Sequence, residues 1–140
     1  MLAYYPATES DVPTIFEQAK ILIDTYEDTA AIEYDNVLAW VKRKIDSCIF
    51  SYTRVTLAGE ICAYYRLCDD GELDDLYVLP DFRNQGIGSE ILSKCVQESK
   101  QPLWLYVFSR NTGAISFYKR FGFTIREMIG TTRLIMARNG

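Results

Sequence analysis

The chain spans 140 residues, of which 49% are hydrophobic, and it carries a formal charge of −4. These values predict one folded domain with a substantial core, and they argue against a disordered chain and against a nucleic-acid partner. No apolar run reaches the about 20 residues that span a bilayer, and the first residues lack a signal core, so we expect a cytoplasmic protein with no membrane partner.

The N-terminal part of the chain predicts a strand followed by two helices. We expect the strand over residues 2–5, and Thr8 with Asp11 three residues later is a capping pattern for the first helix. Apolar residues then recur at helical spacing over 12–26, so this helix buries one face. The eight acids and one base of residues 1–35 make this segment strongly acidic.

The second helix is predicted over residues 33–46. One side of it carries four apolar residues: Val37, Leu38, Val41 and Ile45. Lys42, Arg43 and Lys44 follow one another near its end, and we expect all three on the solvated surface.

The rest of the chain alternates strands with helices. The expected elements are strands at 48–57, 60–68 and 72–79, a helix at 86–99, a strand at 103–108, a helix at 111–121, and strands at 123–129 and 131–137. Ala58 and Gly59 make the first two of these strands a hairpin, and Gly122 ends the last helix. This order predicts an α/β protein.

The chain contains no histidine and four cysteines, without a CxxC pair. These facts exclude a histidine general base, a Ser/His or Cys/His nucleophile pair and a Cys/His zinc site, and we expect no metal. Proton transfer must then use carboxylates, tyrosines or water. We expect Cys48, Cys62, Cys68 and Cys95 to be small buried residues.

A glycine turn joins the strand at 72–79 to the next helix, and it has the composition of an anion site. Gly86 and Gly88 open the helix, whose first backbone N–H groups lack internal partners, and Arg83 adds a fixed charge one turn earlier. Ser89 and Glu90 follow, so neither a P-loop nor a three-glycine dinucleotide loop is present. The alternative is an ordinary strand-to-helix turn.

Two groups of residues, in this order, resemble the two signature motifs of the GNAT N-acetyltransferase superfamily: Val78, Pro80, Arg83, Gly86, Ile87 and Gly88, then Asn111, Ala114, Phe117, Tyr118, Gly122 and Phe123. The resemblance extends over nearly the whole chain. It implies a single domain over residues 1–140, with a mixed sheet of about six or seven strands that splays at the cofactor site and is flanked by about four helices.

The resemblance also implies acetyl-coenzyme A as the cofactor. The residues that would line its site are Leu76, Tyr77, Val78, Arg83, Asn84, Gln85, Gly86, Ile87, Gly88, Ser89, Asn111, Ala114 and Tyr118. By the same resemblance, the pantetheine arm would lie along the strand end at Val78, and a backbone N–H after Val78 would stabilise the oxyanion. Asn111 resembles the family's asparagine that contacts the cofactor or orders the site; a helix N-cap is the alternative and does not exclude that role.

Three side chains are candidates for proton transfer. Tyr118 resembles the family's general acid, which protonates the leaving thiolate; the alternative is a core tyrosine on the buried face of its helix. Glu72 and Asp74 are the candidate bases, with water as a third possibility. Strand alternation places both carboxylates on the face of Leu76 and Val78, opposite Leu73, Asp75 and Tyr77. The alternative is that they are solvated carboxylates at a strand edge.

The function that follows is direct transfer of an acetyl group from acetyl-coenzyme A to a primary amine, with no covalent enzyme intermediate. The acids of the first segment, Glu27, Asp28, Glu33 and Asp35, suggest a small cationic amine or a basic peptide as acceptor. The alternatives are a non-catalytic acyl-coenzyme A binding module and a structural interaction domain. Tyr64, Tyr65 and the final strands are compatible with a homodimer.

Overall fold

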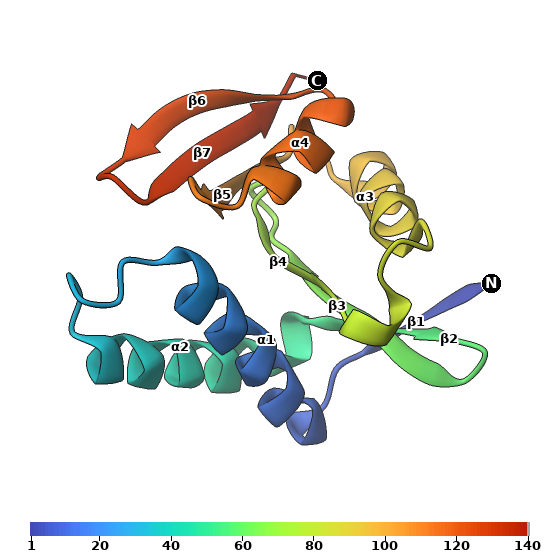
Figure 1. Cartoon of the computed structure of the whole chain (residues 1–140). Coiled ribbons are helices and arrows are strands. Elements are labelled where there is room, and N and C mark those ends of the chain that lie inside the picture. Colours follow the sequence, from blue (N-terminus) through green and yellow to red (C-terminus); the bar gives the residue numbers. More distant parts are fainter. Residues whose placement is uncertain (140) are drawn as a thin grey trace.

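In the computed structural model, which describes residues 1–139, strands and helices follow the order expected from the sequence (Figure 1). The strands are β1 (Leu2–Pro6), β2 (Thr53–Leu57), β3 (Glu60–Leu67), β4 (Leu73–Val78), β5 (Trp104–Phe108), β6 (Phe123–Ile129) and β7 (Arg133–Arg138). The α-helices are α1 (Val12–Tyr26), α2 (Tyr34–Cys48), α3 (Ile87–Glu98) and α4 (Thr112–Arg120). Short 3-10 turns lie at Glu9–Asp11, Ile49–Ser51 and Pro80–Phe82.

The strands form two antiparallel sheets that meet at one point. The first sheet has the order β1-β2-β3-β4 and the second the order β5-β7-β6. A single parallel bridge between Glu72 and Trp104 joins them, supported by the Trp104 N–H, which donates to the Gly71 carbonyl at 3.1 Å. Past this junction β4 and β5 separate, and Figure 1 shows the gap that opens between the two sheets.

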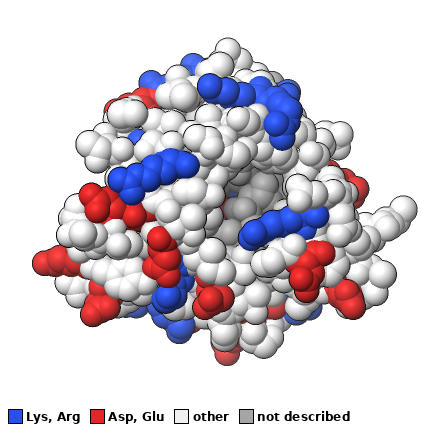
Figure 2. Space-filling view, in the orientation of Figure 1, with Lys and Arg blue, Asp and Glu red and all other residues white. Residues whose placement is uncertain are grey.

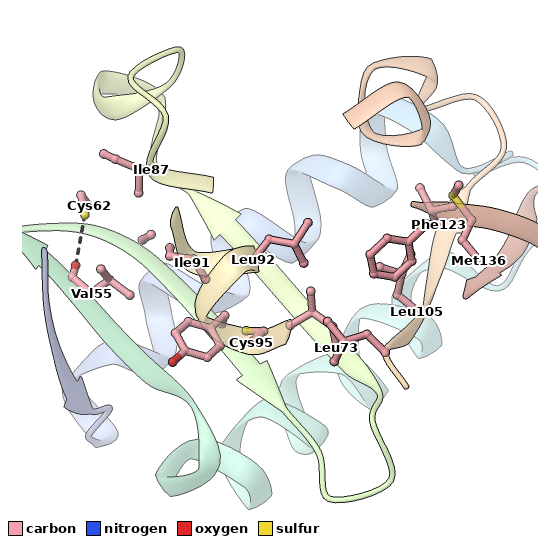
Figure 3. Packing of buried hydrophobic residues seen from close by; sticks show 14 of the residues in the cluster. Val55, Cys62, Leu73, Ile87, Ile91, Leu92, Cys95, Leu105, Phe123 and Met136 are labelled. Atoms are coloured by element: carbon pink, nitrogen blue, oxygen red, sulfur yellow. Dashed lines mark hydrogen bonds between the residues drawn. The ribbon is translucent and has the colours of Figure 1, made fainter. Parts of the chain in front are cut away.

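Helices cover both faces of the first sheet. α1 and α2 pack on one face, where Tyr52, Tyr64 and Tyr77 belong to the same core cluster. α3 packs on the other face, and its buried residues join Leu73 and the inner residues of the second sheet. These residues form a second core cluster. Figure 3 shows Ile91, Leu92 and Cys95 of α3 in this cluster, together with Leu105, Phe123 and Met136. The expected α/β fold with seven strands and four helices is confirmed.

One local prediction, the strand over residues 48–57, fails in its first part. Residues 48–52 are not part of a strand: Cys48 ends α2, Ile49–Ser51 form a 3-10 turn, and β2 begins at Thr53. Ile49 and Tyr52 are 2% and 1% exposed, and their spacing of three suits a helical turn that points both side chains into the core. A strand would direct them to opposite faces.

Burial corrects two further expectations. Tyr64 and Tyr65 lie inside the protomer, 1% and 5% exposed, so they offer no dimer surface. Cys62 and Cys95 are buried as expected, whereas Cys48 and Cys68 are only half-buried. Within residues 1–139, no helix has the length and apolar character needed to cross a bilayer.

Candidate functional site

A cleft of about 1050 Å³ lies where the two sheets separate. Its walls come from α1 and α2 on one side, from the start of α3 and from α4 on the other, and from β4 and β5 behind. Figure 2 shows this face of the molecule hollowed near its centre, with basic side chains on both sides of the hollow. The cleft therefore begins at the point where β4 and β5 separate.

The glycine turn forms one end of this cleft. Asn84 and Gly86 have positive φ angles of 62° and 78°, and α3 starts immediately after them at Ile87. A Cβ atom on Gly86 would meet no atom within 4 Å, whereas one on Gly88 would lie 3.5 Å from the Phe117 ring. Gly88 thus lets α3 pack closely on α4, and Gly86 keeps the space in front of the helix open.

The first turn of α3 supplies unused backbone donors. The Glu90 N–H is the first to bond back, to the Gly86 carbonyl at 3.1 Å, and no side chain of residues 1–139 caps the helix start. The N–H groups of Ile87, Gly88 and Ser89 precede that first bond and have no intrahelical acceptor. Together with the helix dipole, they make this end of the cleft suitable for an anion.

The exposed edge of β4 supplies a second set of backbone groups. Leu79 donates its N–H to the Cys62 carbonyl at 2.9 Å, within the pairing of β4 with β3. Along an antiparallel pair, residues that bond to the partner strand, such as Leu79, alternate with residues whose N–H and C=O point away from that strand. Leu76 and Val78 are those residues, so their backbone groups face the cleft. The N–H after Val78 is therefore used inside the sheet and is not the oxyanion donor expected from the sequence.

The cleft brings together nearly all the residues predicted for a cofactor site. Those that line it are Leu76, Tyr77, Val78, Arg83, Asn84, Gly86, Ile87, Gly88, Ser89, Asn111, Ala114 and Tyr118. Gln85 is not among them; its side-chain amide donates to the Asp81 carbonyl at 3.4 Å, outside the lining. Arg83 donates from Nε to the Val78 carbonyl at 3.2 Å, which ties the turn to the end of β4.

α4 contributes Asn111 and Tyr118 to the opposite wall. Asn111 Oδ1 accepts a hydrogen bond from the Ala114 N–H at 3.1 Å, so its N-cap role is confirmed. The Tyr118 ring packs against Phe117 and Phe123 at centroid distances of 5.2 and 5.4 Å. Burial, together with the negative charge of Asp75 and a smaller contribution from Cys95, raises the pKa of Tyr118, so the phenol stays protonated.

A β-bulge at Asp74 changes the faces expected for β4. Leu67 pairs with Leu73 but Arg66 pairs with Asp75, which leaves Asp74 as the extra residue. As a result Leu73 packs on the α3 side, while Tyr77 packs under α1 and α2. The prediction that Leu73, Asp75 and Tyr77 share a face is wrong, because the extra residue reverses the alternation after Leu73.

The bulge directs two carboxylates toward Lys44 of α2. Lys44 Nζ lies 2.5 Å from Asp74 Oδ2 and 3.0 Å from Asp75 Oδ2, and Asp74 also pairs with Arg66 at 2.8 Å. Asp75 accepts further hydrogen bonds from the hydroxyls of Tyr52 and Tyr77. Burial raises the pKa of Asp75, and Lys44 opposes this.

Lys44 therefore lines the cleft and is only 22% exposed, contrary to its expected place on the solvated surface. Burial acts to lower its pKa, but the attraction of Asp75 and Asp74 outweighs this and raises it, so the ammonium stays charged. The sequence held one signal of this position: Lys44 follows Val37 and Val41 at helical spacing, on the face that turns toward the protein.

Glu72 is the remaining carboxylate predicted as a base, and it also lines the cleft. Among the residues that the structure describes, it has no ion-pair partner. Burial is the main cause that raises its pKa, followed by repulsion from Asp74 and Asp70. Cys68 Sγ and the carboxylates of Asp70 and Glu72 lie within 4.8 Å of one another. A carboxylate in this environment holds a proton more readily than an ordinary glutamate.

The buried thiol of α3 has no part in this site. Cys95 is fully buried, and burial raises its pKa to about 12, with repulsion from Glu98 adding to the effect. A nucleophilic cysteine needs the opposite, a lowered pKa and some exposure. The geometry thus agrees with the expectation that no enzyme thiol takes part in the chemistry.

Comparison with known proteins adds the family. Residues 14–123 match the model of the "Acetyltransferase (GNAT) family". An uncharacterized N-acetyltransferase of Methanocaldococcus jannaschii is 38% identical over 71 residues, which are 46% of this chain and 30% of that relative. The matching part is thus less than a third of the relative's length.

Solved structures of this fold are similar over nearly the full chain. The apo form of YjaB from Escherichia coli has a TM-score of 0.73 at 17% identity and covers 100% of this chain and 99% of its own. PaiA N-acetyltransferase from Thermoplasma acidophilum, solved in complex with coenzyme A, has a TM-score of 0.69 at 17% identity, with coverage of 100% and 99%. At these identities the likeness establishes the fold.

Proposed function

The chain belongs to the acetyltransferase (GNAT) family, and we propose that it transfers an acetyl group from acetyl-coenzyme A directly to a primary amine. The observation that carries the proposal is the single cleft at the β4–β5 divergence. It is lined by a helix start whose first N–H groups have no intrahelical acceptor, the edge of β4 that faces away from β3, a protonated phenol, and a carboxylate without an ion-pair partner in residues 1–139.

The cleft suits the two polar parts of coenzyme A. The diphosphate would bind to the N–H groups of Ile87, Gly88 and Ser89, with Arg83 beside them. The pantetheine amides would pair with the backbone of Leu76 and with the Val78 carbonyl, as an added strand pairs with a sheet edge, which leaves the Val78 N–H for the reacting carbonyl. Gly86 leaves the space in front of the helix empty of side chain.

Acetyl-coenzyme A supplies a thioester, whose carbonyl carbon bonds to the amine nitrogen as its carbon–sulfur bond breaks. Tyr118 then gives its phenolic proton to the sulfur that leaves. With a phenol pKa of about 10 and a thiol pKa of about 8.5, this transfer is uphill by about 2 kcal/mol. Burial raises the pKa of Tyr118, and burial in the same cleft also penalises the thiolate that leaves, so the two effects oppose each other.

Glu72 is the better of the two candidate bases. A lysine-like amine of pKa about 10.4 is neutral in only about one molecule in 2,500 at pH 7, so removal of its proton assists attack. Asp74 is held in ion pairs by Lys44 and Arg66, so its carboxylate is already engaged by the protein. Glu72 has no such partner among the described residues, and its raised pKa makes it the stronger base. It would act directly or through a water.

The oxyanion that develops on the carbonyl needs a donor on the cleft side of β4. The Val78 N–H points away from β3 and meets this requirement, whereas the Leu79 N–H does not.

The test is release of free thiol from acetyl-coenzyme A with a panel of primary amines. We expect turnover with at least one amine, and a rise in melting temperature when coenzyme A is added. Binding of coenzyme A without turnover on any amine would instead favour a non-catalytic acyl-coenzyme A binding module. No rise in melting temperature at high excess would favour a structural domain.

A further inference from the structure

The cleft contains a cation that belongs to the protein itself. Lys44 Nζ sits between the carboxylates of Asp74 and Asp75, and its third neighbour is the Tyr52 hydroxyl at 2.9 Å. An ammonium group with two carboxylates and a hydroxyl around it is the arrangement that a substrate amine would seek. Lys44 thus fills the strongest cation-binding position of the cleft.

With Lys44 included, the acidic and basic side chains that line the cleft carry equal and opposite formal charge. Among the described residues that line the cleft, the acids are Glu27, Glu72, Asp74 and Asp75, and the bases are Lys44, Arg83, Arg120 and Arg133. Asp74 is held twice, by Lys44 and Arg66, and Asp75 by Lys44. Only one carboxylate near the reacting centre, Glu72, is left to receive a substrate cation.

The wall beside Lys44 is apolar. On α2 the residues that precede Lys44 on the cleft side are Val37, Trp40 and Val41, at helical spacing. Trp40 is 60% exposed, so its indole lies at the mouth of the cleft. α1 adds Ile21 to the same lining, which is 39% exposed.

An aromatic pair extends this surface. The rings of Tyr26 and Phe108 lie 6.4 Å apart at 28°, one at the end of α1 and the other at the end of β5, and both line the cleft. Flat apolar surface of this kind binds the body of a ligand while a few polar groups fix its orientation.

We propose that the acceptor, given the N-acetyltransferase activity proposed above, is a primary amine with one positive charge and an apolar alkyl or aryl body, and that Lys44 excludes polyamines. The single ammonium meets Glu72, and the body lies on Trp40, Val37 and Val41. A second ammonium on the same chain would approach Asp74 and Asp75, whose charges are already paired with Lys44, so no free carboxylate compensates there for its lost hydration.

The decisive comparison uses two amines of equal length, hexylamine and 1,6-diaminohexane. We expect kcat/KM of the wild-type protein to favour hexylamine by about tenfold or more. In Lys44→Met the carboxylates lose their internal cation, so we expect the ratio to fall by about tenfold. Lys42→Met is the matched control, because Lys42 is an exposed residue of the same helix that pairs with Asp46, and its ratio should equal that of the wild type.

Equal or faster turnover of the diamine by the wild type would overturn the proposal, and so would an unchanged ratio in Lys44→Met. If Lys44→Met does not fold, Trp40→Ala tests the apolar wall at an exposed position. We expect Trp40→Ala to raise KM for hexylamine about tenfold and to leave KM for methylamine unchanged. Equal effects on both amines would refute the role of the wall.

Two further arms separate the remaining outcomes. A tetrapeptide that begins with leucine also presents one primary amine beside an apolar group, so its kcat/KM relative to hexylamine tells a peptide acceptor from a free amine. If coenzyme A raises the melting temperature but no amine turns over, the proposed activity is wrong. Calorimetry of hexylamine and 1,6-diaminohexane with the coenzyme A complex then measures the selectivity alone, and tighter binding of the diamine would contradict it.

Discussion

Two tyrosine hydroxyls in this protein have different expected roles, one in catalysis and one in stability. The Tyr118 hydroxyl lines the cleft and makes no hydrogen bond to any residue that the structure describes, residues 1–139. The Tyr64 hydroxyl lies outside the cleft and donates to Asp11 Oδ1, at 2.6 Å, in the core. We expect Tyr118→Phe to lose activity and keep its stability, and Tyr64→Phe to do the opposite.

The two magnitudes follow from these contacts. A hydrogen bond to a charged group contributes about 2 kcal/mol to stability. For 140 residues at about 2.1 cal/mol/K each, the unfolding entropy is about 0.3 kcal/mol/K, so Tyr64→Phe should lower the melting temperature by about 7 °C. Tyr118→Phe breaks no protein hydrogen bond and should shift it by less than about 2 °C. Loss of a general acid slows turnover about 100-fold, which is about 2.7 kcal/mol of barrier.

The assay is thiol release at saturating acetyl-coenzyme A, with the melting temperature of each variant measured in parallel. We expect the coenzyme A induced rise in melting temperature to be the same in Tyr118→Phe and the wild type, since the phenyl ring remains in the wall. Normal turnover of Tyr118→Phe would refute its role as the acid. A loss of turnover that came with a loss of coenzyme A binding would show that the hydroxyl binds rather than donates a proton.

Three further predictions follow from the site and its junction. Because the pKa of Glu72 is raised, it becomes protonated at a higher pH than an ordinary glutamate; we expect kcat to fall below that pH, and Glu72→Gln to remove this acid limb and lower kcat about 100-fold. Iodoacetamide should modify half-buried Cys48 and Cys68 before fully buried Cys95, as peptide mass spectrometry would record. An alanine Cβ at Gly71 would lie 2.3 Å from the Pro102 carbonyl oxygen, whereas at Gly59 it would meet nothing within 4 Å; both have positive φ, so in urea unfolding Gly71→Ala should cost at least about 2 kcal/mol more than Gly59→Ala. The first prediction would be contradicted by a fall in kcat at the same pH in Glu72→Gln, the second by modification of Cys95 before Cys48 and Cys68, and the third by equal costs of the two glycine substitutions.

The sequence predicted those parts of the protein that depend on neighbours along the chain. The glycine turn is visible because Gly86 and Gly88 follow a strand and open a helix, and the N-cap role of Asn111 is visible because its acceptor lies three residues away. Helix spacing likewise predicted that the helix over residues 12–26 buries one face, and α1 does bury Ile15, Ala19 and Ile23. In each case the physical cause acts within one turn of the backbone.

The failures share a different cause, since each depends on a partner far away in sequence. The sequence predicted Lys44 on the solvated surface because its partners, Asp74 and Asp75, lie about 30 residues later in the chain. Only the fold brings the three side chains together. The bulge at Asp74 arises from the pairing of β4 with Arg66 and Leu67 of β3, and the residues of β4 alone carry no sign of it. Local pattern cannot fix register between strands, and one extra residue reverses every face beyond it.

The bulge explains how a single strand can serve both substrates. After Asp74, the backbone of Leu76 and Val78 faces the diverging edge, where an extended cofactor arm can pair with it. At the bulge itself, two carboxylates turn toward α2, where Lys44 neutralises them. Before it, Glu72 lies at the junction of the two sheets and keeps its charge unpaired among the described residues. If residues 73–75 followed regular strand alternation with no bulge, Asp75 would turn toward α3 with Leu73, away from Lys44. The acceptor side of the cleft would then lose the charge arrangement that leaves Glu72 as its available base.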